Sequence, residues 1–177
     1  MIMQSVQQFR DFLLRRIDKT RDAKKLSDDE KQRRIESLNE ILELEILDPV
    51  YNRFDTMWLV EKIKEERSTA TLYLENNTRN FDEMKDKLKS INSQIMLLEQ
   101  SLASCKKREA EIVEEDFIAN ELRENREEIE EELAKLKKEA GVCKNLMKMK
   151  SYYEHLLHTL SHLLGILMNP NYFSYLK

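Results

Sequence analysis

The sequence predicts an all-α fold: an elongated coiled coil with a short N-terminal helical hairpin and an apolar C-terminal helix. Three observations lead to this prediction. Glycine and proline each occur only twice in 177 residues, against average usages of about 7% and 5%. Charged residues make up 36% of the chain, and most are Glu, Lys and Arg, which favour helices. Finally, a 3.5-residue apolar repeat, typical of a left-handed coiled coil, runs through the middle of the chain.

The N-terminal segment, residues 1–49, is predicted to form a helical hairpin. Apolar residues recur at helical spacing over residues 3–24, which indicates a first helix. Ser27 and Glu30 match a capping box that would start a second helix. Pro49 would end that helix, because the residue before a proline is pushed out of the α region. The apolar stripe expected on the second helix consists of Ile35, Leu38, Ile41, Leu42 and Leu47.

The middle segment, residues 50–150, is predicted to be the coiled-coil region. Its first apolar seam advances in steps of three and four residues and is interrupted by Arg67 and Asn77. A second seam begins at Leu122 in a different phase and contains Arg126. One long helix of a globular bundle is the alternative, since the same spacing suits an ordinary core. The seam residues expected to bind a partner are Val60, Ile63, Leu74, Phe81, Met84, Leu88, Ile91, Ile95, Leu98, Leu102, Leu122, Ile129, Leu133 and Leu136.

The change of phase between the two seams has two interpretations. A three-residue insertion would overwind one continuous coil, whereas a reversal near residues 114–117 would make an antiparallel hairpin. Because no glycine or proline lies there, we expect one helix from about residue 52 to 140. Residues 75–80, ENNTRN, are a second place where the chain could bend, because Asn and Thr side chains compete for backbone hydrogen bonds.

The C-terminal segment, residues 151–177, is almost free of charge, with two charged residues out of 27. Its leucines and tyrosines fall in one sector of a helix that would end near Pro170. We expect this sector and the aromatic tail to dock on another protein. The docking residues expected are Tyr153, Leu156, Leu157, Leu160, Leu163, Leu164, Leu167, Tyr172 and Phe173.

All three histidines, His155, His158 and His162, share the opposite face of this C-terminal helix. Zinc ligands can come from a helix at such spacing, but no glutamate follows a histidine directly and only Glu154 is a nearby carboxylate. A solvent face in this protein would be expected to carry Lys and Glu. We therefore expect the histidines to pack in a second, polar interface, and we expect no metal and no cofactor.

The sequence favours a non-enzymatic role. It contains no glycine-rich phosphate loop, no nucleophile elbow and no Cys–His arrangement that suggests catalysis. We expect a coiled-coil structural or scaffold subunit of a larger multi-protein assembly. One alternative is a compact helical bundle with a metal- or ligand-binding histidine face. Another is a nucleic-acid-associated helical protein, although its basic residues are interleaved with acids and no aromatic stacking platform is present.

The charged residues in the predicted seam indicate whether the partner is a second copy or a different chain. Arg67 and Arg126 would face their own copies in a homodimer, although Asn77 would favour one. We therefore expect other coiled-coil chains as partners, and a heteromeric partner over a homodimer. Residues 109–132 carry a net charge of −10 and residues 135–150 one of +5, so the first block would repel itself in a parallel, in-register pair and attract a basic partner.

The remaining features concern the cellular setting. Cys105 and Cys143 are 38 residues apart and form no CxxC pair, so a disulfide framework is not expected. No stretch approaches the ~18 apolar residues of a membrane span. The expected setting is soluble, reducing and intracellular, either cytoplasmic or nuclear, with no membrane.

Overall fold

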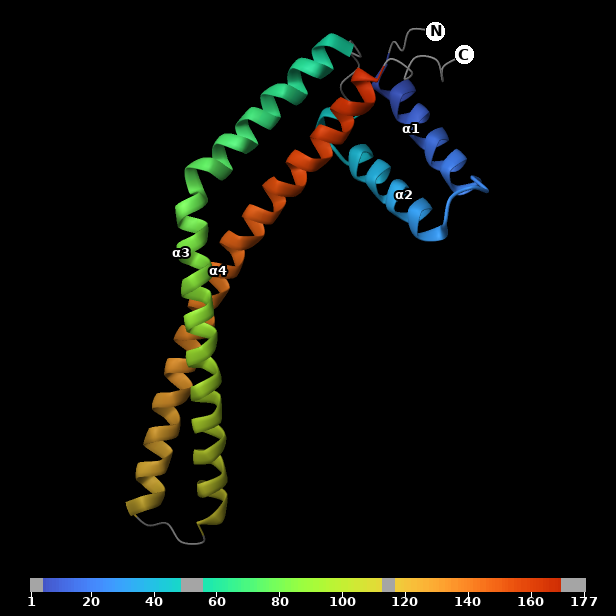
Figure 1. The fold of residues 1–177 in the computed structure, drawn as a ribbon. Coiled ribbons are helices and arrows are strands. Elements are labelled where there is room, and N and C mark those ends of the chain that lie inside the picture. Colours follow the sequence, from blue (N-terminus) through green and yellow to red (C-terminus); the bar gives the residue numbers. More distant parts are fainter. Residues whose placement is uncertain (1–4, 49–55, 113–116, 170–177) are drawn as a thin grey trace. The chain divides into compact units, whose positions relative to one another are not determined.

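The computed structural model describes residues 5–48, 56–112 and 117–169, and the regular structure in these ranges is entirely helical (Figure 1). This confirms the predicted all-α class. The chain divides into two compact units. Unit 1 combines residues 1–75 with residues 153–177, and unit 2 consists of residues 76–152. The elements are α1 (Val6–Arg21), α2 (Asp28–Leu42), the 3-10 helix η1 (Glu45–Leu47), α3 (Thr56–Glu111) and α4 (Phe117–Met168).

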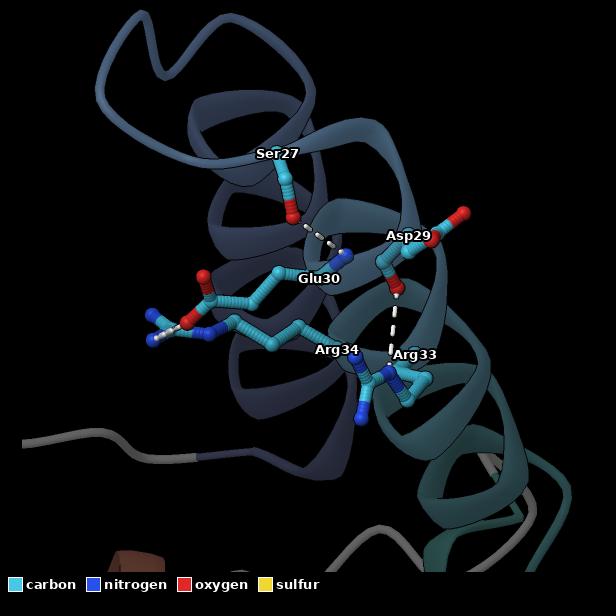
Figure 2. A network of polar contacts seen from close by, with 5 residues as sticks. All are labelled: Ser27, Asp29, Glu30, Arg33 and Arg34. Atoms are coloured by element: carbon cyan, nitrogen blue, oxygen red, sulfur yellow. Dashed lines mark hydrogen bonds and ion pairs between the residues drawn. The ribbon is translucent and has the colours of Figure 1, made fainter.

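Helix α2 begins at the predicted cap. The Oγ of Ser27 accepts a hydrogen bond from the backbone N–H of Glu30 at 3.3 Å (Figure 2), which satisfies one of the donors left open at a helix start. The side chain of Glu30 forms an ion pair with Arg34 at 2.6 Å. Nearby, the Nε of Arg33 donates to the carbonyl oxygen of Asp29 at 3.3 Å. The first turn is therefore held by one cap bond and by contacts four residues apart.

The second helix ends earlier than its apolar stripe predicts. Helix α2 stops at Leu42, and Leu47 lies in η1, where it is fully buried. Arg10 on α1 makes this ending stable, because its Nη1 donates to the carbonyl oxygens of Leu42 at 2.7 Å and Leu47 at 3.1 Å. These are carbonyls that the end of a helix leaves without partners. Helices α1 and α2 also pack against each other.

The core of unit 1 is assembled from segments far apart in the sequence. Helices α1 and α2, η1, the start of α3 and the end of α4 all contribute side chains to one apolar cluster. Its largest fully buried members are Val6, Phe9, Leu13, Ile41, Leu47, Leu59, Ile63, Leu160 and Leu163.

In unit 2, helices α3 and α4 lie side by side and run in opposite directions (Figure 1). Ion pairs join Glu99 to Lys137 and Lys106 to Glu130, so residues later in α3 meet residues earlier in α4. The expectation of one continuous helix to about residue 140 is therefore wrong. The position of the alternative reversal, residues 114–117, falls largely outside the described residues, and residues 75–80 stay helical within α3.

Candidate interaction surfaces

The predicted seam is the contact line between α3 and α4 in unit 2. Ile91, Ala140 and Cys143 form a small buried cluster there, at 4%, 4% and 1% exposure. The Sγ of Cys143 lies 3.8 Å from the sulfur of Met84, a distance at which the two polarisable groups are in contact. The chain thus covers its own seam with its second half.

The seam residues named from the sequence divide between the units. Val60 and Ile63 pack in the core of unit 1. Leu74 also belongs to unit 1 and is partly buried. In unit 2, the buried seam residues are Phe81, Ile91 and Leu133. The partly buried ones are Met84, Leu88, Ile95, Leu98, Leu102, Leu122, Ile129 and Leu136.

Ion pairs flank the seam of unit 2. Lys137 and Glu99 approach to 2.9 Å, Lys106 and Glu130 to 3.4 Å, and Lys87 and Glu139 to 3.6 Å. All six side chains are largely exposed, so each pair adds only ~0.2–1 kcal/mol. Their main effect is on the register of the two helices. Residues later in α3 pair with residues earlier in α4, so the three pairs can form together only when the helices are antiparallel.

Arg126, a polar member of the seam, finds an acidic partner inside its own chain. Its Nε is buried and lies 3.6 Å from Oε2 of Glu109. The two side chains are 31% and 23% exposed, less than those of the other ion pairs between α3 and α4. The sequence signal was available: Glu109 is the position at which the first seam's repeat fails, and Arg126 is the polar member of the second seam. It was not used, because the reversal of the chain was not expected.

Arg67, the other basic seam residue, lies in unit 1, where its Nε is buried without a hydrogen-bond partner among the described residues. Burial and the negative charge of Glu45 raise the pKa of the neighbouring Glu66 carboxyl. Arg67 and Glu66 therefore bring polar groups into a partly buried surface of α3 at a desolvation cost.

The apolar face of the C-terminal helix lies against other parts of unit 1. Leu160, Leu163 and Leu167 are buried in its core, and Leu156 and Leu164 pack against that core. Leu157 is partly buried. The partly buried Tyr153 places its ring centroid 4.1 Å from that of Tyr73. Tyr172 and Phe173 lie outside the described residues.

Two buried residues of this helix were missed by the sequence analysis. Ile166 joins the core of unit 1 at 6% exposure. Thr159 is 3% exposed, and its Oγ1 has no hydrogen-bond partner within the described residues. Ile166 could have been included by widening the apolar sector, whereas nothing in the sequence marks Thr159 as buried.

The histidine face contacts α2. The Nδ1 of His162 lies 2.8 Å from the Oγ of Ser37, and the Nε2 of His155 lies 3.6 Å from a carboxylate oxygen of Glu40. His158 is exposed. Burial, followed by the positive charges of Arg16 and His158, lowers the pKa of His162. Of the three histidines, only His162 is partly buried against α2, whereas His155 and His158 are exposed, so the polar interface expected for the whole face is formed at His162 alone.

The described ranges contain neither a metal-ligand cluster nor a helix that could span a membrane. Nowhere in residues 5–48, 56–112 and 117–169 do three His, Cys, Asp or Glu side chains gather in a way that could hold a metal ion. Within the same ranges, every helix is too short or too polar to cross a bilayer. Comparisons of the chain with protein-family models, with curated proteins and with solved structures give no match.

Proposed function

We propose that this chain is a non-enzymatic structural subunit of a larger protein assembly. The observation that carries the proposal is the pairing of α3 with α4 in unit 2. A thin apolar seam with a 3.5-residue repeat lies between them, and interhelical ion pairs flank it on exposed positions. Such a pattern is typical of a coiled coil, and we interpret unit 2 as an antiparallel one within a single chain.

The mechanical role proposed for unit 2 is to hold bound proteins at a set spacing. Residues 76–111 of α3 are continuously helical, which corresponds to a length of about 54 Å at a rise of 1.5 Å per residue. A paired helix of this length resists bending better than a loop or a single helix does. No ligand chemistry is needed for this function, only surfaces at defined positions along the helices.

The partner proposed is another helical chain, of a different sequence, that docks beside the seam and on the C-terminal helix. Two helices alone cannot enclose their seam, and Leu88, Leu98 and Leu102 stay partly exposed for that reason. A third or fourth helix laid along them would bury the remaining apolar area, at roughly 25 cal/mol per Å². In unit 1, Leu157 and Tyr153 offer partly exposed area of the same kind.

The experiment that tests this function is tagged capture of the full chain from its source cells, followed by cross-linking and mass spectrometry. We expect a stoichiometric helical partner, cross-linked to lysines of unit 2. Leu98→Glu should reduce its recovery at least about tenfold, because a buried charge on the docking line costs more than 1.4 kcal/mol. The matched control is Leu97→Glu, since Leu97 is already 59% exposed.

Circular dichroism of both variants separates loss of the partner from loss of fold. If the chain is recovered alone as a stable monomer, or if Leu97→Glu and Leu98→Glu reduce partner recovery equally, the proposed function is wrong.

A further inference from the structure

A second periodic stripe follows α4 on the side opposite to α3. It advances in alternating steps of four and three residues. Lys135 is two residues from the buried Leu133, and Val142 is two residues from the buried Ala140, which places each about 160° around the helix from the seam. The stripe consists of Phe117, Glu121, Glu124, Glu128, Glu131, Lys135, Lys138, Val142, Asn145 and Met149, and all ten are exposed. We call it the outer face of α4.

The charges on the outer face are segregated along the helix. Four consecutive positions are glutamates and the next two are lysines. The residues next to the centre, Glu128, Glu131, Lys135 and Lys138, belong to no ion pair within the described parts of the chain. By contrast, Glu130 and Lys137 on the same helix do pair, with α3. The outer face thus presents charges that this chain does not match internally.

This order of charges allows the outer face to pair with a second copy of itself that runs in the opposite direction, because glutamates then lie opposite lysines. An antiparallel second copy, related by a two-fold axis passing at residue 133, sets Glu131 opposite Lys135 of the second copy and Glu128 opposite its Lys138. The axis generates each contact twice, which gives four ion pairs. A parallel copy would instead set glutamate against glutamate and lysine against lysine, which is destabilising.

The apolar end of the outer face fits the same arrangement. Val142 is 57% exposed and Met149 is 42% exposed, and Leu146 beside them is 39% exposed. In the antiparallel pair, Met149 lies opposite Phe117 of the second copy, whose side chain is 78% exposed. Val142 lies opposite Glu124 and Asn145 opposite Glu121, so one apolar contact, Met149 with Phe117, closes each end of the interface and the ion pairs occupy its centre.

Only one register satisfies both conditions. Sliding the second copy by seven residues in one direction sets Lys135 against Lys138, and sliding it in the other sets Glu128 against Glu131. Each shift introduces a like-charge contact at the centre of the pair, where the two-fold axis repeats it. The charge pattern therefore specifies the alignment as well as the direction.

We propose that the outer face of α4 binds a second copy of this chain in an antiparallel, two-fold symmetric homodimer. This interface is separate from the seam, so the like charges of Arg67 and Arg126 do not oppose it. It is also independent of the structural role proposed above, because a heteromeric partner on the seam leaves the outer face available.

The test is sedimentation equilibrium of the full chain at low and high salt. Four exposed ion pairs of ordinary strength imply that the dissociation constant rises by about 30-fold when salt screens them. Two charge-reversed variants follow: one carries Lys135→Glu with Lys138→Glu, and the other carries Glu128→Lys with Glu131→Lys. Each carries a single sign of charge at the four central positions 128, 131, 135 and 138 and should dimerise much more weakly by itself than the original chain.

Mixing these two variants gives the decisive result. The four central acids of the first variant match the four central lysines of the second in the antiparallel register, so an equimolar mixture should dimerise again. The matched control is Lys85→Glu with Lys89→Glu, which makes the same change in net charge at exposed positions of α3 and should dimerise as the original chain does.

Three outcomes would overturn the homodimer: an original chain that stays monomeric up to about millimolar concentration, a variant mixture that does not associate, or a control as impaired as the variants. Capture of a heteromeric partner can succeed or fail independently of all three.

Discussion

Unit 1 and unit 2 share the helices α3 and α4 but bury their apolar residues to different depths. In unit 1, Phe9, Leu13 and Leu163 are completely inaccessible, because α1, α2 and η1 add further layers around the ends of the long helices. In the described part of unit 2, α3 packs against α4 alone, and fewer residues are buried: Phe81, Ile91, Leu133, Ala140 and Cys143. The number of helices that surround a residue decides its burial, since the apolar repeat along α3 is much the same in both units.

The two units also use charge differently. Most of the low-charge segment after residue 150 belongs to the unit with the thick core, where α2 also contacts His162 and His155. The strongly charged blocks before residue 150 belong to the two-helix unit, where both flanks and the outer face meet water. The change in composition along α4 therefore marks the passage from one unit to the other.

The largest difference is expected from matched core truncations. Leu163→Ala removes a fully buried side chain from unit 1 and should lower the free energy of unfolding by ~2–5 kcal/mol. Urea denaturation followed by circular dichroism measures it. Leu97→Ala, at a 59% exposed position, should stay within ~0.5 kcal/mol of the original chain. Equal losses for both would show that the core of unit 1 is not the main source of stability.

The corresponding change in unit 2 is expected to cost less. Ile91→Ala should lower stability by ~2 kcal/mol, the lower end of the usual range, because the thin seam can relax into the space. Hydrogen exchange resolved by residue should speed up within residues 76–152 and change little in unit 1. Met96→Ala, at a 56% exposed position, is the control. Faster exchange spread evenly over both units would mean that they unfold together.

Replacing the buried hydroxyl of Thr159 in the core of unit 1 is expected to stabilise the protein. The Oγ1 of Thr159 is buried without a partner within the described residues, so Thr159→Val should raise the free energy of unfolding by ~1 kcal/mol. Thermal and urea denaturation both report it. Thr69→Val is the control, because the Oγ1 of Thr69 donates to the carbonyl of Glu65 at 3.1 Å on an exposed surface. A destabilised Thr159→Val protein would show that the hydroxyl is hydrogen-bonded.

The smallest expected effect is the pH dependence from His162. Burial and the positive charges of Arg16 and His158 lower the pKa of His162, and the negative charge of Glu40 only partly offsets them. The imidazole therefore binds a proton more readily in the unfolded chain than in the folded one. Stability should therefore fall as pH drops through and below the ordinary histidine value of ~6.5. The measurement is the change in the urea midpoint between about pH 7.5 and about pH 5, on either side of that value. This change should be smaller in His162→Gln than in the original chain, whereas in the exposed control His158→Gln it should stay closer to that of the original chain.

Much of the helical layout could be predicted from the sequence. Ser27 and the helical spacing of Phe9 and Leu13 identified the first two helices, because capping and amphipathicity are local properties. The seam residues likewise fell on the less exposed side of α3 and α4. Local patterns could not give the contact at the end of α2, where Arg10, 32 positions away in the sequence, donates a hydrogen bond to the carbonyl of Leu42.

The reversal of the chain and the occupant of each apolar face could not be predicted in the same way. An apolar stripe shows that a face is covered but not by what. For this reason Leu160 and Leu163 were expected to dock on another protein, and they lie in the chain's own core. The opposite charges of Glu109 and Arg126, which pair in the structure, are one sequence feature that favours an antiparallel pair over a continuous rod.

The division of unit 1 into residues 1–75 and 153–177 has a consequence for the order in which the protein folds. Unit 1 cannot close until α4 has been synthesised almost to its end, whereas unit 2 needs only a local zipping of two neighbouring helices. Contacts between near neighbours form faster than contacts that close a long loop. Unit 2 should therefore form first and shorten that loop. During synthesis, the part of the apolar surface of α1 and α2 that α4 covers in unit 1 stays exposed, and this is the state most prone to aggregation and most dependent on chaperones.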